Sequence, residues 1–233
     1  MDIETVPLFA DFDELGSKEQ RLFDHKTRYQ RKQNESADDF YHKAGIWAEF
    51  GKIICISCGV LYDEDGVLKF KLKSFYSGSE YKLLYEFKNL LDKGFSSPRH
   101  LLCAHNGKEF DFPFLARRMI IQEIELPDIL RLYNKKPWEV RHLDTMELWK
   151  FGDYKHFTSL ELLAHILNIE SAKNDMTGAD VAQVYYRQND LNRIVDYCER
   201  DTITLARVYL KLMNKGQLGE EHIYGKISRE VHL

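Results

Sequence analysis

Residues 52–76 decide the fold of this chain; they read KIICISCGVLY, then DEDG, then VLKFKLKSFY. The first and last of these runs are apolar and rich in β-branched and aromatic residues, which predicts two strands. Between them, Asp65-Gly66 is the dipeptide most typical of a tight hairpin turn. The sequence therefore predicts an antiparallel strand pair.

Strands and helices are expected to alternate after this hairpin. Helical patterns occupy four stretches, and two short apolar runs between them indicate buried strands. The expected elements are helices over 79–93, 110–123, 158–167 and 190–213 and strands over 100–104 and 141–145. A hairpin followed by alternating strands and helices indicates an α/β fold.

We interpret residues 1–233 as a single domain that opens with a strand over residues 1–8. Residues 9–45 are highly charged with interspersed aromatic residues. They are expected to form an insertion packed on the domain, with a helix over 17–33. The polar tail from about residue 217 is expected to fray.

The chain has 33 Lys and Arg against 37 Asp and Glu, a formal net charge of −4. This balance gives no support for a strongly basic nucleic-acid coat, but it leaves room for carboxylates that bind phosphate through metal ions. No apolar run approaches the roughly 18 residues of a membrane span, and no basic-then-apolar leader opens the chain. We therefore expect a cytoplasmic protein with no membrane partner.

The four cysteines do not make a disulfide scaffold, which would be short and rich in cysteine. Cys55 and Cys58 form a C-x-x-C pattern, but in a strand two positions three apart face opposite sides. No second pair is present to complete a zinc site. Buried free thiols are the simplest interpretation.

Acidic residues in three separate segments suggest a site. Asp2 and Glu4 are two apart on the first predicted strand and so face the same side. Their mutual repulsion is relieved by a divalent metal with oxygen ligands. Asp111 opens a predicted helix after a His105-Asn106 turn, where alone it would be a favourable dipole partner.

The third segment lies on the last predicted helix, where Tyr197 and Asp201 are four apart and share a face. Alone, this pair reads as a half-buried tyrosine beside a solvated aspartate. The conjunction of all three segments, in this order along the chain, points instead to one shared site.

Taken together, these segments resemble the three motifs of the DEDD superfamily of 3′–5′ exonucleases, in the tyrosine-bearing DEDDy variant. Residues 106–115 (NGKEFDFPFL) are similar to the second motif of family B DNA polymerase proofreading domains. The opening DIETVP is similar to predicted stand-alone exonucleases related to those domains. The resemblance runs from residue 2 to about residue 213.

The resemblance implies a ribonuclease H-like α/β fold, with a mixed central sheet flanked by helices. It implies that two Mg²⁺ or Mn²⁺ ions are held by the acidic residues of the motifs, with Asp2 bridging the ions and Tyr197 orienting the nucleophilic water. The four expected metal ligands are Asp2, Glu4, Asp111 and Asp201. The expected activity is hydrolysis of single-stranded DNA from its 3′ end to nucleoside monophosphates. RNA is the alternative substrate, and an inactive nucleic-acid-binding module of the same fold is the alternative function.

The chain departs from the family pattern at its start, because only Met1 precedes Asp2. The first strand is therefore expected to be truncated, leaving Asp2 and Glu4 on a frayed end while Ile3 still docks in the core. No polymerase module follows, so a proofreading domain of a larger chain is not expected.

Several further residues are weaker candidates for substrate contact. Thr5 follows the first motif, Asn106 either bonds substrate or closes a turn, and Phe110 either wedges against a base or packs in the core. Asp144 is either near the site or an ordinary helix cap, and His105 is expected to be structural. The basic runs at 26–28, 31–32, 117–118 and 135–136 are expected on the solvated surface; the first two alternate with Tyr29 in a way that suits single-stranded nucleic acid.

Overall fold

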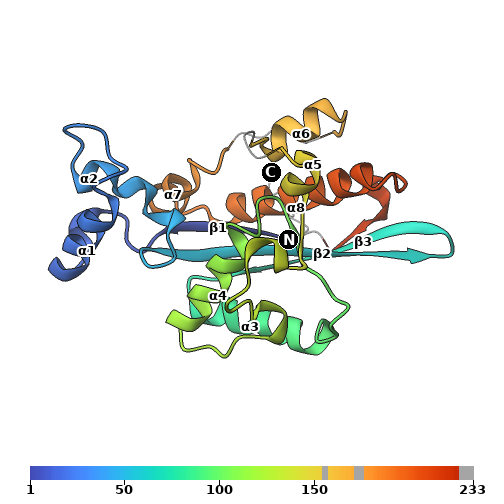
Figure 1. The fold of residues 1–233 in the computed structure, drawn as a ribbon, viewed down its shortest axis with the longest axis horizontal. Helices are drawn as coiled ribbons and strands as arrows, with labels where there is room; N and C mark the ends of the chain where they lie inside the picture. The colour runs from blue at the N-terminus through green and yellow to red at the C-terminus, as the bar shows by residue number, and fades with distance from the viewer. Residues whose placement is uncertain (154–156, 171–175, 226–233) are drawn as a thin grey trace, which may run out of the picture.

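The computed structural model describes residues 1–153, 157–170 and 176–225 (Figure 1). The described strands are β1 (Asp2–Pro7), β2 (Gly51–Glu64), β3 (Val67–Tyr76), β4 (Cys103–Ala104), β5 (Leu143–Asp144) and β6 (Ile223–Tyr224). The described α-helices are α1 (Ser17–Thr27), α2 (Ala37–Phe40), α3 (Glu80–Gly94), α4 (Asp111–Ile121), α5 (Thr145–Lys150), α6 (Leu160–Ile166), α7 (Val181–Gln183) and α8 (Leu191–Leu212). Short 3₁₀ or π turns occupy Phe12–Glu14, Tyr41–Ile46, Asp128–Leu130, Pro137–Glu139, Val184–Gln188 and Glu220–His222.

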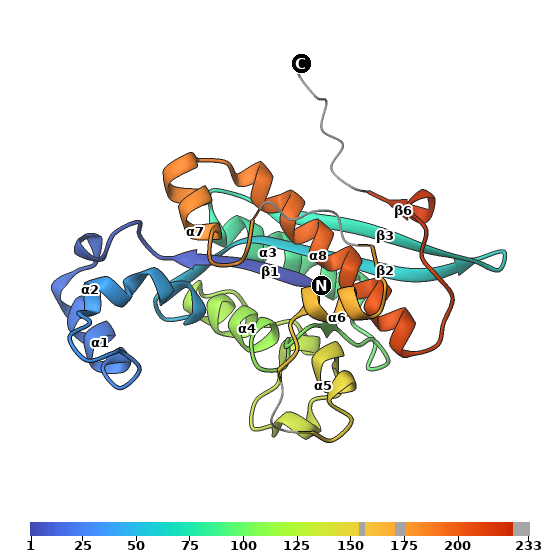
Figure 2. The ribbon, with the colours of Figure 1, turned by 90° about the horizontal axis from the view of Figure 1, so that it is seen from above.

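The predicted hairpin is confirmed as β2 and β3, which pair antiparallel from Cys55↔Tyr76 to Glu64↔Val67. Asp65 and Gly66 have φ values of 56° and 80°, so both turn residues are left-handed. A turn with two positive φ values matches the twist of the flanking strands. The hairpin is long, and its tip extends past the rest of the molecule (Figures 1 and 2).

The structure is a mixed α/β fold with a mixed sheet between layers of helices. The four-stranded sheet has the order β1-β2-β3-β6, and β4 and β5 form a separate parallel pair. The amino group of Met1 donates a hydrogen bond to the Cys103 carbonyl at 2.7 Å, which joins β1 to β4. Within the hydrogen-bonded sheet, β1 is thus an edge strand that touches β4 at its first residue.

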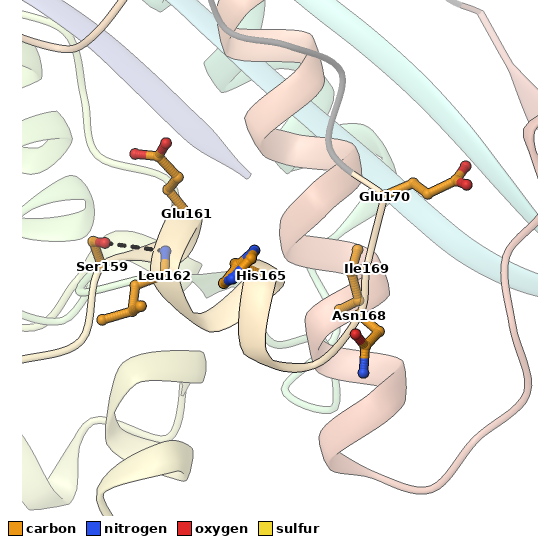
Figure 3. Close-up of a pocket in the computed structure, with 7 residues that line it drawn as sticks. All are labelled: Ser159, Glu161, Leu162, His165, Asn168, Ile169 and Glu170. Carbon is orange, nitrogen blue, oxygen red and sulfur yellow. Dashed lines mark hydrogen bonds between the residues drawn. The ribbon is translucent and has the colours of Figure 1, made fainter.

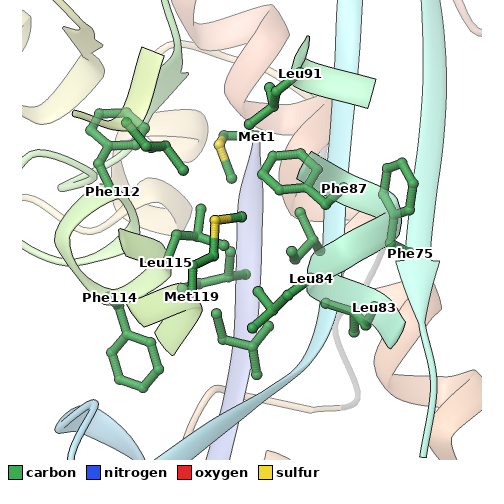
Figure 4. Packing of buried hydrophobic residues seen from close by; sticks show 14 of the residues in the cluster. Met1, Phe75, Leu83, Leu84, Phe87, Leu91, Phe112, Phe114, Leu115 and Met119 are labelled. Atoms are coloured by element: carbon green, nitrogen blue, oxygen red, sulfur yellow. The ribbon is translucent and has the colours of Figure 1, made fainter. Parts of the chain in front are cut away.

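The expectation that the chain begins on a frayed end is wrong. Asp2 is paired opposite Ser57, and the Met1 side chain is buried between α3 and α4 (Figure 4). Ile3 docks in the same core, as predicted. The reason is that Met1 supplies both an apolar side chain and a backbone donor, which together tie down the strand.

The two faces of the sheet have different cores. Ile3 and Ile56 pack with residues of α3 and α4, whereas Val6 and Cys55 pack with residues of α7 and α8. These two pairs of helices lie on opposite faces of the sheet (Figure 1). Cys58 packs against the first core, so the two C-x-x-C thiols point to opposite faces as predicted. All four cysteines are free.

An apolar cavity of about 440 Å³ lies directly ahead of β1. β1 pairs with β2 only as far as Ser57, so among the described strands none pairs with the same edge of β2 at residues 58–64. The cavity is lined by Met1, Cys58, Gly59, Val60, Lys71, Lys73, Phe87, Leu90, Leu91, Phe95, Leu101, Leu102 and Cys103.

The segment before β2 projects from one end of the sheet and has its own small core around Phe23 (Figure 1). The helix predicted over 17–33 ends at Thr27, where the Thr27 hydroxyl donates to the Phe23 carbonyl at 2.8 Å. Arg31 pairs with Asp24 at 2.5 Å and Lys26 pairs with Glu49 at 3.2 Å. These pairs neutralise part of the positive charge predicted for a nucleic-acid surface.

The tail does not fray where the structure describes it. Leu218 is buried against α8, and Ile223 pairs with Phe70 as β6 extends the sheet. Arg207 adds polar ties, donating to the Leu218 carbonyl at 3.2 Å and pairing with Glu220 at 2.7 Å. Residues 226–233 lie outside the described part of the chain.

The prediction that residues 117–118 lie on the solvated surface is wrong for Arg118, which is buried. Its guanidinium is 3% exposed and binds both carboxylate oxygens of Glu80, at 2.8 and 2.5 Å. Arg118 also donates to the Ala48 carbonyl, and Glu80 accepts from the Ile53 amide. A bidentate pair with further hydrogen bonds offsets the cost of burying both charges.

None of the helices in the described ranges combines the length and apolar character needed to cross a membrane.

Candidate active site

Helix α8 presents Tyr197 and Asp201 to β1. The helix begins after Asp190, whose carboxylate accepts the Arg193 amide hydrogen bond at 3.0 Å. Its buried face, which includes Ile194 and Cys198, packs against the face of the sheet opposite Ile3. Tyr197 and Asp201 lie one turn apart at the border of this face.

Strand β1 presents Asp2 and Glu4 to the same place. The two side chains alternate with Ile3, so they face α8 while Ile3 enters the other core. Glu4 is 6% exposed. The carboxylates of Asp2 and Glu4 and the thiol of Cys198 each have a ligand atom within 4.8 Å of the others.

Asp111 comes from a third segment of the chain and lies in the first turn of α4. The loop before α4 packs so closely on β4 that Gly107 has no room for a side chain. A Cβ atom at this position would be 2.3 Å from the Ala104 side chain. The Phe110 amide donates to the Asn106 carbonyl at 3.0 Å and leads the chain into the helix. The Ile3 amide, which lies between Asp2 and Glu4, is near enough to the Asp111 carboxylate to favour its ionised form.

All four carboxylates of the cluster have a raised pKa, and burial is the main cause in each case. Burial raises the pKa of Asp2 well above its usual value, and the charges of Asp111 and Asp201 raise it further. Burial likewise raises the pKa of Glu4, with further contributions from Asp2 and the other two aspartates. Burial raises the pKa of Asp111 to about 7 and that of Asp201 to about 6.

The donor set fits a divalent cation. The Asp111 Oδ1 atom is buried and has no hydrogen-bond partner within the described chain. Such an atom is costly unless something supplies the missing interaction. Carboxylate oxygens from three segments are the hard ligands that Mg²⁺, Mn²⁺ and Ca²⁺ prefer.

Tyr197 lies beside this cluster, close enough to Asp201 for the two side chains to affect each other's pKa. Burial raises the pKa of the Tyr197 hydroxyl above its usual value, and the charges of Asp201, Glu4 and Asp2 raise it further. The hydroxyl therefore stays protonated and is suited to donate a hydrogen bond.

The weaker candidates lie on the segments that carry the cluster, Thr5 on β1 and the other two just before Asp111. Thr5 is half-buried where the register between β1 and β2 shifts. Asn106 closes a turn in a left-handed conformation, with a φ of 62°, and its buried side-chain oxygen has no partner among the described residues. Phe110 packs on Phe114 with ring centroids 5.3 Å apart. Contacts of these three residues with substrate stay predictions.

His105 is structural, as expected: its ring nitrogens lie 2.9 Å from the Thr145 hydroxyl and 2.8 Å from the Thr158 carbonyl. Asp144 is buried and caps α5, accepting the Met146 amide at 3.0 Å.

Two neighbours of the cluster were not predicted from the sequence. Cys198 donates from its thiol to the Asp2 carbonyl at 3.5 Å; its position three before Asp201 on a helix was the available signal. Glu161 raises the pKa of Asp201 through its charge, but it comes from α6, about 40 residues away in the chain, with no motif to mark it.

Glu161 also lines an open groove of about 760 Å³ along α6 (Figure 3). None of the four carboxylates of the cluster lines this groove. Its described lining includes Glu161 and Glu170 but no Lys or Arg. The charge of the described lining is unfavourable for phosphate.

The fold and the cluster together define a class of protein: a mixed α/β fold whose acidic residues converge on a cluster with the ligand chemistry that divalent cations prefer. The chain belongs to the family of predicted 3′–5′ exonucleases related to the exonuclease domain of PolB, whose sequence model matches residues 46–231. The matched region contains Asp111, Tyr197 and Asp201, whereas Asp2 and Glu4 precede it. A search of curated proteins gave no significant match.

Proposed function

We propose that this protein is a two-metal-dependent 3′–5′ exonuclease that releases nucleoside monophosphates from single-stranded DNA. The observation that carries the proposal is the convergence of Asp2, Glu4, Asp111 and Asp201, four carboxylates from three distant segments. The charges of Asp111 and Asp201 raise the pKa of Asp2 and Glu4. Such a cluster is unfavourable by itself and becomes favourable around divalent cations.

In this mechanism the four carboxylates would hold two Mg²⁺ or Mn²⁺ ions. The ions would supply the positive charge that an in-line displacement needs at the attacking water and the leaving oxygen. Tyr197 keeps its proton and orients the water by hydrogen bonding, while Asp201 fixes the position of the Tyr197 ring. Cys198, which is buried beside Asp2 and Glu4, limits access of bulk water on one side of the cluster.

The direct test uses single-stranded DNA labelled at the 5′ end, incubated with Mn²⁺ and then with excess chelator. The expected product is a ladder shortened from the 3′ end that stops on chelation. The same assay with RNA of equal sequence decides the substrate class. Binding of both nucleic acids with no product under any metal would favour the alternative, an inactive nucleic-acid-binding module.

We expect Tyr197→Phe to lower kcat by less than about 100-fold, the lower range for general acid–base catalysis, because an uncharged hydroxyl positions water rather than accepting its proton. Mn²⁺ affinity should not change. The measurement is kcat against pH for both proteins. A larger loss that vanishes at high pH would show that Tyr197 acts as a base instead.

We also infer a ribonuclease H-like arrangement. Joining the two described sheets at the bond between Met1 and Cys103 gives the strand order β3-β2-β1-β4-β5, with helices on both faces. In this arrangement β1 is central, and the cavity ahead of Met1 lies where a longer central strand would run.

This arrangement predicts the effect of adding a strand. About five alternating Ile, Leu or Phe residues fused ahead of Met1 span roughly 17 Å, enough to pair with β2 at residues 59–63. We expect a higher Tm and tighter Mn²⁺ binding, because strand pairing would then continue on both the N-terminal and the C-terminal side of Asp2. A Gly-Ser extension of equal length is the matched control. If the apolar extension changes Tm and Mn²⁺ affinity no more than this control, β1 is not the central strand.

A further inference from the structure

The carboxylate of Asp144 connects two parts of the chain that meet beside the acidic cluster. Asp144 ends β5, is 3% exposed and is the N-cap residue of α5. Its Oδ1 atom accepts hydrogen bonds from the Asn106 amide at 2.9 Å and the Met146 amide at 3.0 Å. Its Oδ2 atom accepts from the Lys108 amide at 3.1 Å.

Capping α5 does not by itself require this buried carboxylate. A serine or threonine side chain serves an N-cap about as well, with one oxygen bonded to the helix. A buried charge is unfavourable unless several hydrogen bonds compensate it. Here the second oxygen, and the shortest of the bonds, go to a loop 36 and 38 residues upstream.

That loop, residues 105–110, carries the chain into α4 and so places Asp111. Asn106 is left-handed, and its carbonyl accepts the amide of Phe110, the residue directly before Asp111. Lys108 adds a second tie to α5, with its ammonium 2.7 Å from the Glu147 carboxylate. A shift of the Asn106 backbone would therefore pass directly to Asp111.

We propose that Asp144 is a positioning residue: its carboxylate fastens the 105–110 loop to the start of α5 and thereby sets Asp111 against Asp2 and Asp201. The proposal rests on the proposed function, in which Asp111 is a metal ligand. Asp144 acts through the loop and does not itself touch metal or substrate.

Asp144→Ser separates the two roles of the side chain, which are to cap α5 and to bind the amides of the 105–110 loop. Serine still caps α5, but it is too short to bind both loop amides. Asp144→Asn is the second variant; it keeps the size of the side chain but turns an NH₂ group toward one of the two sets of amides. Ser79→Ala is the control for loss of an ordinary cap, since Ser79 accepts the Lys82 amide at the start of α3, away from the cluster.

Two measurements test the proposal: hydrogen exchange at the Asn106 and Lys108 amides, and Mn²⁺ affinity by calorimetry. We expect both Asp144 variants to exchange these amides faster and to bind Mn²⁺ about 10–100-fold more weakly, the usual effect of losing a residue that supports a metal ligand. Ser79→Ala should change neither. Unchanged exchange at the two amides, or unchanged Mn²⁺ affinity in both variants, would overturn the positioning role while leaving the proposed function intact. A wild-type protein that binds no Mn²⁺ would overturn both.

Discussion

Asp201→Asn should abolish nuclease activity while leaving the protein folded. Asn keeps the size of the side chain but removes one negative charge from the shared cluster. We expect a loss well beyond the roughly 10–100-fold that follows removal of a residue that only supports a metal ligand. Release of nucleotides from labelled single-stranded DNA in Mn²⁺ measures the loss.

The same variant should be more stable than the wild type in the absence of metal. Removing Asp201 relieves repulsion that raises the pKa of Asp2 and Glu4, so the gain should be about 1 kcal/mol or more, which is roughly 2–4 °C in Tm for a domain of this size. Asp128→Asn is the matched control, because Asp128 is an exposed acid paired with Arg131 at 3.3 Å, outside the cluster. Activity of Asp201→Asn within about tenfold of wild type would rule out the two-metal site.

The parts of this site that could be predicted from the sequence are those set by local geometry. Alternation on β1 places Asp2 beside Glu4, and one helical turn places Tyr197 beside Asp201. The hairpin could be predicted for the same reason, because its turn depends only on the neighbouring residues Asp65 and Gly66, which adopt a turn that few other pairs allow.

The parts that could not be predicted depend on partners distant in the chain. Arg118 looks like a surface residue until Glu80, 38 residues earlier, is brought beside it in the folded chain. The sequence predicts a frayed tail because the apolar residues of the tail are few. In the structure, however, Leu218 and Ile223 pack against apolar residues of α8 and β3. Asp144 likewise looks like a cap until the loop at Asn106 folds onto it.

Metal-free protein should lose stability as the pH rises from about 6.5 to 8. The folded-state pKa of Asp111 is about 7, and those of Asp2 and Glu4 are raised well above their usual values. In this range the folded state therefore binds more protons than the unfolded state, and the free energy of unfolding falls with rising pH. Each unit by which a folded-state pKa exceeds the unfolded value corresponds to about 1.4 kcal/mol once the group is fully ionised.

Buried histidines set the lower limit of this window. Burial lowers the pKa of His105 and His142 below the usual value of 6.5, so their contribution to stability rises with pH through 6.5 and is mostly complete by about pH 7. Above that pH the carboxylate cluster dominates the slope. Thermal unfolding in chelator at pH 6.5, 7.2 and 8.0 measures it.

Mn²⁺ should reverse this loss, because cations that bind the ionised cluster stabilise the folded state by mass action and require its deprotonated form. The rise in Tm on adding Mn²⁺ should therefore be larger at pH 8.0 than at pH 6.5. Asp201→Asn, with one carboxylate fewer, should show both a shallower slope without metal and a smaller response to Mn²⁺. Metal-free stability that stays level or increases from pH 6.5 to 8.0 would contradict the prediction, because four carboxylates with raised pKa values that share one buried site must become mutually repulsive as they ionise.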